Sequence, residues 1–438
     1  MNLHLGLVTG IVLLGLAAVV IGTRVPTAMA RDLSERRFLR LIFVAALLLR
    51  CGLAVVTYIK FPYGYFAPDE AGTVQVAANY LYNTPSSPVA HGQGWMFFNI
   101  FVFRIFGIEP MLPRLWNCVV GACTPLLGYA LAQEYGAVRG ARWSAILIGF
   151  FPSVVLWSSL NLHDVDAYLV ILLAFLLTIR LQDSPRWWRV VAVALTLSAM
   201  YLLRIFSDAA LLVAVVCGLL VWQLRMPRRM VIRIAGLAGG AIVASIAGAL
   251  VFPRAGQFIY GKSGLSRLAD IRRSFASGAR SAVDVDPGLQ SLGGVLAFLP
   301  LALVDFLLRP FPWEKGSSLS ALTRPEVILY YAILPLVAVG IVLGVRKAGV
   351  RTVPGLVFLA ITGVGYALVV SNLGTIYRER GELLIVMFTF VGVAVDAIGT
   401  RLRTQRLGAG SPQTSNPAGG RGSGRRLTPD AGVDHIRS

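Results

Sequence analysis

Two acidic clusters stand out in a sequence whose charged residues are otherwise sparse. The first is the pair Asp69 and Glu70. The second lies in the segment NLHDVDAY, whose polar members are Asn161, His163, Asp164 and Asp166. Carboxylates and an imidazole can exchange protons with reacting groups, so the clusters indicate general acid–base chemistry. The alternatives are a Mg²⁺ or Mn²⁺ ion held between the carboxylates, or acids that only stabilise the first turn of a helix.

Four arginines form the second group of candidate residues. They are Arg114 in PRLWN, Arg204 in LLRIFSD, and Arg378 and Arg380 in GTIYRERGE. A guanidinium group keeps its charge at any working pH and binds phosphate through a rigid fork of donors. These arginines therefore indicate an anionic substrate, with lipid headgroup phosphates as the alternative partner. For Arg378 and Arg380, the neighbouring Glu379 and Glu382 are a second alternative.

The composition excludes an ordinary soluble enzyme. Of 438 residues, 56% are hydrophobic and 14% are charged, whereas charged residues make up about 25% of a typical soluble domain. The formal net charge is +19, which in so apolar a chain indicates membrane topology and contact with anionic lipids rather than nucleic-acid binding. The four cysteines form no CxxC pair and no cluster with histidine, so neither a disulfide framework nor a zinc site is expected.

Apolar runs long enough to span a bilayer, which takes about 20 residues, recur along the chain. About eleven candidates lie near 3–22, 38–59, 112–134, 141–160, 164–181, 190–204, 207–224, 232–252, 326–345, 353–370 and 382–399. Two shorter runs, 92–106 and 292–308, are interpreted as interfacial or re-entrant. The fold class is therefore an all-α polytopic membrane protein, with one integral domain over 1–400. Residues 401–438, rich in Gly, Ser, Pro and Arg, are expected to form a disordered basic cytoplasmic tail.

Arginine bias orients these spans. The loop from Arg24 to Arg40 is rich in arginine and should be cytoplasmic. Alternation then places these segments outside: 60–111, 161–164, 205–207, 253–291 and 371–381. Both acidic clusters and the four arginines consequently fall at outer ends of spans. The basic stretch 253–291, which includes Arg272 and Arg273, is an exception to the bias.

The segment after Asp69 has the pattern of a short amphipathic helix. Val74, Ala77, Ala78 and Leu81 share one helical face. We expect this helix to rest on the outer membrane surface.

In this order and on one membrane face, the motifs resemble the GT-C superfamily of membrane glycosyltransferases. The most similar branch contains the protein mannosyltransferases and the aminoarabinose transferases (glycosyltransferase family 39-like). The resemblance rests on the Asp-Glu pair after an early span, on PRLWN, and on the block FPSVVLWSSLNLHD. It covers about residues 40–210, and YRERGE adds a later match.

The resemblance implies transfer of a sugar from a polyprenyl-phosphate donor to an extracytoplasmic lipid, glycan or protein. The family's catalytic base carries over to Asp69, and the acid that begins the later span carries over to Asp164. Glu70 is a further catalytic candidate. Substrate binding is expected from Arg114, His163, Asp166, Arg204, Arg378 and Arg380. The excess of arginine over lysine indicates a bacterium, so the expected location is the inner membrane, with the active site on its outer face.

A sugar bonded to a lipid phosphate leaves a stable anion when it is transferred, so one base suffices where a glycosidase needs two carboxyl groups. A single displacement inverts the anomeric carbon. Two other classes remain open: a lipid or glycan transporter or flippase, and a polysaccharide polymerase or ligase. A transporter should show paired, interrupted helices in corresponding halves, and the sequence displays no such pair. The sugar, the acceptor, the carrier length and any metal requirement stay undetermined.

Overall fold

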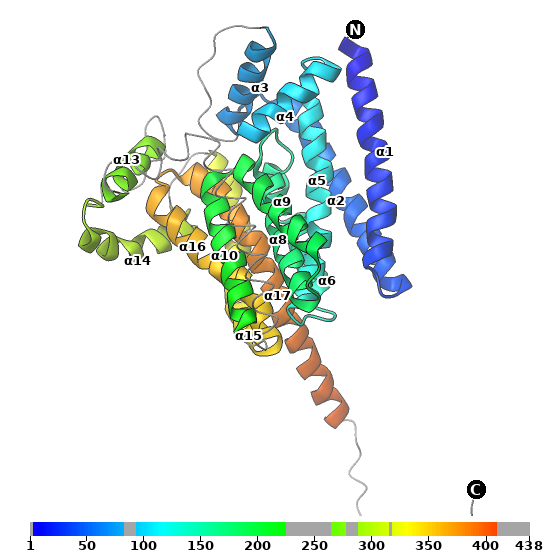
Figure 1. The fold of residues 1–438 in the computed structure, drawn as a ribbon, viewed down its shortest axis with the longest axis vertical. Coiled ribbons are helices and arrows are strands. Elements are labelled where there is room, and N and C mark those ends of the chain that lie inside the picture. Colours follow the sequence, from blue (N-terminus) through cyan, green and yellow to red (C-terminus); the bar gives the residue numbers. More distant parts are fainter. Residues whose placement is uncertain (1–2, 83–92, 225–263, 277–287, 315–317, 410–438) are drawn as a thin grey trace, which may run out of the picture. The chain divides into compact units, whose positions relative to one another are not determined.

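The computed structural model describes residues 3–82, 93–224, 264–276, 288–314 and 318–409. Within these residues the chain is helical and contains no β-sheet, which confirms the all-α prediction (Figure 1). The chain forms two compact units, residues 1–398 and 399–438. The predicted span 232–252, much of the basic stretch 253–291 and the tail from 410 lie outside the described residues.

The described residues form fifteen α-helices. In chain order they are α1 (Leu3–Met29), α2 (Leu33–Lys60), α3 (Pro68–Leu81), α4 (Gln93–Phe106), α5 (Met111–Glu134), α6 (Ala141–Phe150), α7 (Pro152–Trp157), α8 (Asp164–Asp183), α9 (Trp187–Leu203), α10 (Ile205–Gln223), α13 (Gly264–Ala276), α14 (Leu292–Leu308), α15 (Ser318–Ala348), α16 (Val353–Val369) and α17 (Leu373–Ala409).

Six helical segments of the described chain are long and apolar enough to cross a membrane. They are Leu5–Met29, Leu33–Lys60, Met111–Glu134, Ile205–Gln223, Thr323–Val369 and Leu373–Arg403. The shorter apolar helices include α4 and α14, which the sequence predicts to be interfacial or re-entrant. These segments indicate a multi-pass membrane protein, while the count of about eleven spans stays a prediction.

The core of the bundle lies around α5, α8 and α17. α5 packs against α1, α2, α6 and α8, and α8 also packs against α9 and α10 (Figure 1). Most of the buried apolar residues of α5, α8 and α17 belong to one continuous cluster. Close helix packing in lipid depends on small side chains. At Gly128 of α5, for example, an added Cβ would collide with the Ile148 side chain of α6.

The apolar run 141–160 is not the single continuous helix that the sequence predicts, because it breaks into α6 and α7. Phe151 has an extended backbone (φ −65°, ψ 125°) and precedes Pro152. Proline disfavours helical geometry in the residue before it and lacks an N–H for the ladder. The fully buried Arg50 of α2 donates to the carbonyl of Gly149 at 2.8 Å and to Ser158 Oγ at 2.7 Å. The carbonyl of Gly149 at the break is therefore hydrogen-bonded inside the protein. Backbone groups at membrane depth need such internal partners, because no water is available there.

The residues around Arg378 do not form the predicted loop, while their place on the outer face stays a prediction. α17 begins at Leu373, so the segment YRERGE is helical. Arg378 and Arg380 consequently point to different sides of α17. Gly381 allows the close approach of α8, because a Cβ there would collide with the hydroxyl of the buried Tyr168. The charged side chains of the first turns of α17 are consequently held against the start of α8.

The short helix predicted after Asp69 is present as α3. Its apolar face does not lie free, because Val74, Ala77 and Leu81 join a cluster with Phe103 of α4 and Leu112 of α5. α3 is therefore packed on protein along the face that the sequence assigned to the membrane surface.

Candidate functional site

The two acids at the start of α3 point in different directions. Pro68 occupies the first position of the helix, where its fixed φ suits helix initiation. Asp69 and Glu70 follow in the first turn. The Asp69 side chain is 66% exposed, whereas the Glu70 side chain is 1% exposed. Only the first acid is thus open to a substrate.

Glu70 forms a buried ion pair with Arg114 of α5. Arg114 Nε and Nη2 donate to the two carboxylate oxygens at 2.6 and 2.7 Å. The backbone N–H of Asn161 also donates to Glu70 Oε1 at 2.8 Å. Burial, together with the charge of Glu70, raises the pKa of the nearby Tyr63 well above its ordinary value, so this phenol stays neutral. These contacts tie α3 and α5 to the turn before α8 and leave Glu70 no free oxygen.

Asp69 belongs to a second chain of charges that joins three distant segments. Its Oδ2 accepts a hydrogen bond from Arg378 Nη1 of α17 at 2.6 Å. Arg378 Nε in turn donates to both oxygens of Asp164, at 2.9 and 3.0 Å. Asp164, in the first turn of α8, also accepts from Arg204 Nη2 at 2.6 Å. The series runs from the exposed Asp69 to buried groups between α8, α10 and α17.

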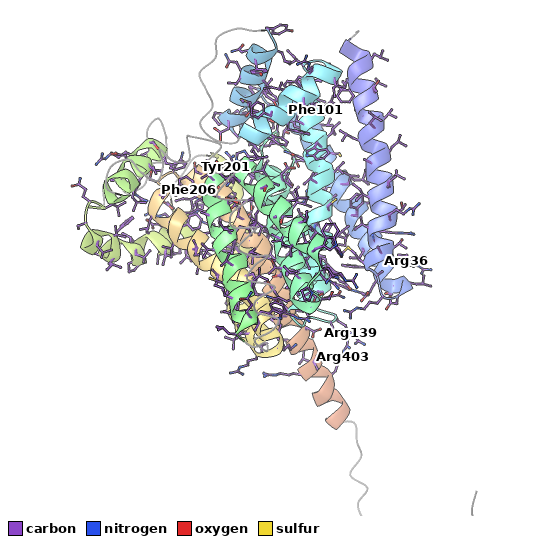
Figure 2. All side chains as sticks on the ribbon, in the orientation of Figure 1. Arg36, Phe101, Arg139, Tyr201, Phe206 and Arg403 are labelled. Carbon is purple, nitrogen blue, oxygen red and sulfur yellow. The ribbon has the colours of Figure 1, made fainter. Side chains whose placement is uncertain are left out.

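Arg204 stands at the corner between α9 and α10, which Tyr201 and Phe206 mark in Figure 2. It pairs with Glu379 and, at 3.1 Å, with Glu382. This corner and Arg139 lie at opposite ends of the bundle (Figure 2).

The linked cluster carries more negative than positive charge. Its ion pairs join two guanidinium groups, Arg204 and Arg378, to four carboxylates. The four carboxylates are Asp69, Asp164, Glu379 and Glu382. Each arginine is therefore firmly held, and Asp69 is the member of the cluster with the most exposed side chain.

The remaining candidates are Asp166, His163 and Arg380. Asp166 accepts a hydrogen bond from the indole N–H of Trp116 at 3.1 Å. His163 is the residue before α8, next to Asp164. Arg380 faces the other side of α17, where its Nε donates to the carbonyl of Phe306 at 3.0 Å.

Arg380 borders a small pocket with both polar and apolar lining. The pocket is lined by Phe151, Ser153, Glu326, Val327, Tyr330, Tyr377, Arg380 and Leu384. The guanidinium lies 5.3 Å from the centre of the Tyr330 ring. Arg378 and Arg380 therefore contact different residues, although they are only two positions apart in the sequence.

Sequence reasoning missed part of the cluster. Glu379 and Glu382 were considered only as partners of their neighbouring arginines, yet they pair with Arg204. Tyr366 and Ser207 were not considered: the Tyr366 hydroxyl lies 3.2 Å from Arg204 Nη1, and Ser207 Oγ donates to Glu382 at 2.7 Å. The available signal was the i, i+3 spacing of the two glutamates, which places them on one face of a helix.

The carboxylates do not form a metal site in the part of the chain that the structure describes. No group of three or more His, Cys, Asp or Glu side chains there has an arrangement that could hold a metal ion. Both oxygens of Asp164 accept hydrogen bonds from guanidinium groups, so this carboxylate does not fit a Mg²⁺ or Mn²⁺ ligand set.

No protein-family model matches the sequence, and no curated protein matches it. Among solved structures, the archaeal oligosaccharyltransferase AglB from Archaeoglobus fulgidus, in complex with an inhibitory peptide and a dolichol-phosphate, is similar with a TM-score of 0.46 and 12% identity. The similarity covers 86% of this chain and 52% of that one. The Archaeoglobus fulgidus oligosaccharyltransferase in the apo form gives a TM-score of 0.45 and 12% identity, over 86% and 53%. The chain thus spans about half the length of each.

Proposed function

We propose that this protein transfers a sugar from a polyprenyl-phosphate donor to a hydroxyl group of an extracytoplasmic lipid, glycan or protein. The observation that carries the proposal is the pairing of Asp69 with Arg378. An exposed carboxylate, suited to accept a proton, lies 2.6 Å from a guanidinium group suited to bind phosphate. The motifs that resemble those of GT-C glycosyltransferases support the same chemistry.

In this mechanism Asp69 accepts the proton of the acceptor hydroxyl as its oxygen attacks the anomeric carbon. The bond between that carbon and the phosphate oxygen breaks, and the polyprenyl phosphate leaves as an anion. Arg378 stabilises the charge that develops on the leaving group. A guanidinium about 4 Å from a unit charge contributes about 4 kcal/mol at an effective dielectric constant near 20, before desolvation. One displacement inverts the anomeric centre.

The buried partners position Arg378. Asp164 holds its Nε, and Arg204 holds Asp164 from the other side. Because Nε and Nη1 are engaged by Asp164 and Asp69, the guanidinium plane is fixed beside the base. We assign Glu70 and Arg114 to the support of the α3 turn, because their charged groups are buried and face each other. Asp164 likewise acts through Arg378 in this assignment.

The proposed setting is the inner membrane of a bacterium, with about eleven spans and with Asp69 on the outer face. His163 and Asp166 lie at the same end of α8 as Asp164 and are proposed to contact the sugar or the acceptor. Arg380 is the weakest of the proposed phosphate ligands, since it bonds to carbonyls at the end of α14.

The test is transfer by the purified protein in proteoliposomes, supplied with polyprenyl-phosphate sugars and acceptors from the same organism. Wild type should release polyprenyl phosphate and form a new glycoside, and Asp69→Asn should lower the rate by about 10²–10⁴-fold. Asp183→Asn is the control, because Asp183 ends α8 and pairs with Arg351. Near-normal transfer by Asp69→Asn would remove Asp69 as the base. A donor that is carried across the bilayer unbroken would indicate a transporter instead.

A further inference from the structure

One arginine of the exceptional basic stretch 253–291 has a defined structural partner. Arg272 of α13 is 2% exposed. Its Nη1 donates to the backbone carbonyls of Ala367, Leu368 and Val370 at 3.3, 3.2 and 3.3 Å. Its neighbour Arg273 is exposed and pairs with Asp270 inside the same helix at 2.9 Å. Arg272 is therefore not a solvated charge, and adjacent residues of one helix offer a matched comparison.

The three carbonyls belong to the C-terminal end of α16. The last carbonyls of a helix have no partner inside the helix, and this end carries partial negative charge. A guanidinium group donates hydrogen bonds to these carbonyls, and its positive charge faces the negative end of the helix. Basic side chains commonly make such contacts at helix ends. The side chain also lies over the ring of Phe298 in α14, 4.8 Å from its centre.

The contact is reciprocal. Ser371, which is fully buried between α16 and α17, donates its hydroxyl to the carbonyl of Arg272 at 2.7 Å. α13 is thus bonded to the α16–α17 corner, defined as residues 367–372, through both the side chain and the backbone of Arg272.

The α16–α17 corner has a site residue on each side. Tyr366 precedes it and shares hydrogen bonds with Arg204 and Ser207, at 3.2 and 2.8 Å. Arg378 follows it, near the start of α17, and reaches both Asp69 and Asp164. A displacement of the corner would therefore move the groups that surround Asp164 from both directions.

We propose that Arg272 is a positioning residue, which fixes the α16–α17 corner so that Arg378 meets Asp69 and the donor phosphate. The proposal rests on the proposed function, and Arg272 itself touches no substrate. It also explains why this arginine occurs in a segment where the charge bias of membrane proteins disfavours it. Arg272 binds the C-terminal end of α16. It affects the position of Arg378 only through the α16–α17 corner.

Two measurements on the full chain test the proposal: amide hydrogen exchange of residues 366–376, and the kcat and KM values of transfer. The variants are Arg272→Ala, Arg272→Lys and the control Arg273→Ala. Loss of a charged buried hydrogen-bond donor should speed exchange at the corner by about tenfold or more in Arg272→Ala. Lysine keeps a charged donor and should restore most protection. Arg273→Ala should match wild type.

In transfer assays, Arg272→Ala should raise the KM for the donor and lower kcat, with little change in the KM for the acceptor, and Arg272→Lys should recover most of both. Unchanged exchange at the corner in Arg272→Ala would overturn the proposal, as would an equal effect of Arg273→Ala. Faster exchange with unchanged donor kinetics would show that the corner does not position the site. If no glycosyl transfer is found at all, the exchange result still tests the docking of α13 on its own.

Discussion

Replacement of Asp164 by asparagine tests whether the buried carboxylate holds the two arginines. Asp164 accepts hydrogen bonds from Arg378 and Arg204 at 2.6 to 3.0 Å. Asparagine has nearly the same volume but no charge, and its amide nitrogen would oppose a guanidinium donor. Removing one partner of a buried ion pair costs about 3–5 kcal/mol. Because Arg204 keeps two glutamates, we expect the lower end, about 3 kcal/mol.

Asp166→Asn is the matched control for the stability measurement. Asp166 lies two residues further along α8 and accepts one hydrogen bond from a neutral indole, so its loss should cost about 0.5–1.5 kcal/mol. The assay is the denaturation midpoint of both variants in the same detergent, followed by transfer kinetics on the folded fraction. Asp164→Asn should unfold earlier and saturate poorly with donor, since Arg378 loses the partner of its Nε. Equal stability of the two variants would refute the assignment of Asp164 as the holder of the arginines.

Three further predictions concern packing, the donor and topology. Gly381→Ala should destabilise the protein by about 1–3 kcal/mol in the denaturation assay, through overpacking. Gly365→Ala is the control and should be neutral, because a Cβ there meets nothing within 4 Å. Equal effects of the two changes would contradict the close approach of α8 and α17. At Arg378, transfer activity should fall from arginine to lysine to alanine, with donor saturation affected most. The same changes at Arg380 should lower stability rather than donor saturation. If donor saturation depends on Arg380 and not on Arg378, then Arg380 is the phosphate ligand. A cysteine at Ser86, outside the described residues, should react in intact cells with an impermeant thiol reagent once the native cysteines are removed, and labelling only after lysis of the inner membrane would invert the topology.

The sequence was sufficient to predict the helical class and to assign Asp69 and Arg378 to the same membrane face, but it did not predict their direct contact. Both predictions depend on local patterns and charge bias, which act over short segments. The different roles of Asp69 and Glu70 were not predictable, because adjacent residues of a helix point about 100° apart. Which of them meets Arg114 depends on how α3 packs on its neighbours.

Other misses had local signals that the predictions did not use. Pro152 in the middle of an apolar run is a known cause of a helix break, and it separates α6 from α7. Arg50, inside a predicted span, is a charge at membrane depth and so a marker of a buried polar contact. The pairing of Glu382 with Arg204 has no such signal, because it depends on tertiary packing between distant helices.

The most direct test of the central claim is the stereochemistry of transfer by the wild-type protein in proteoliposomes. A polyprenyl-phosphate sugar of known anomeric configuration would be supplied with a hydroxyl acceptor, and the product would be examined by NMR spectroscopy. A single displacement with Asp69 as base predicts one equivalent of polyprenyl phosphate and a glycoside of inverted configuration. A product with retained configuration, or a donor that remains intact while it crosses the bilayer, would contradict the account.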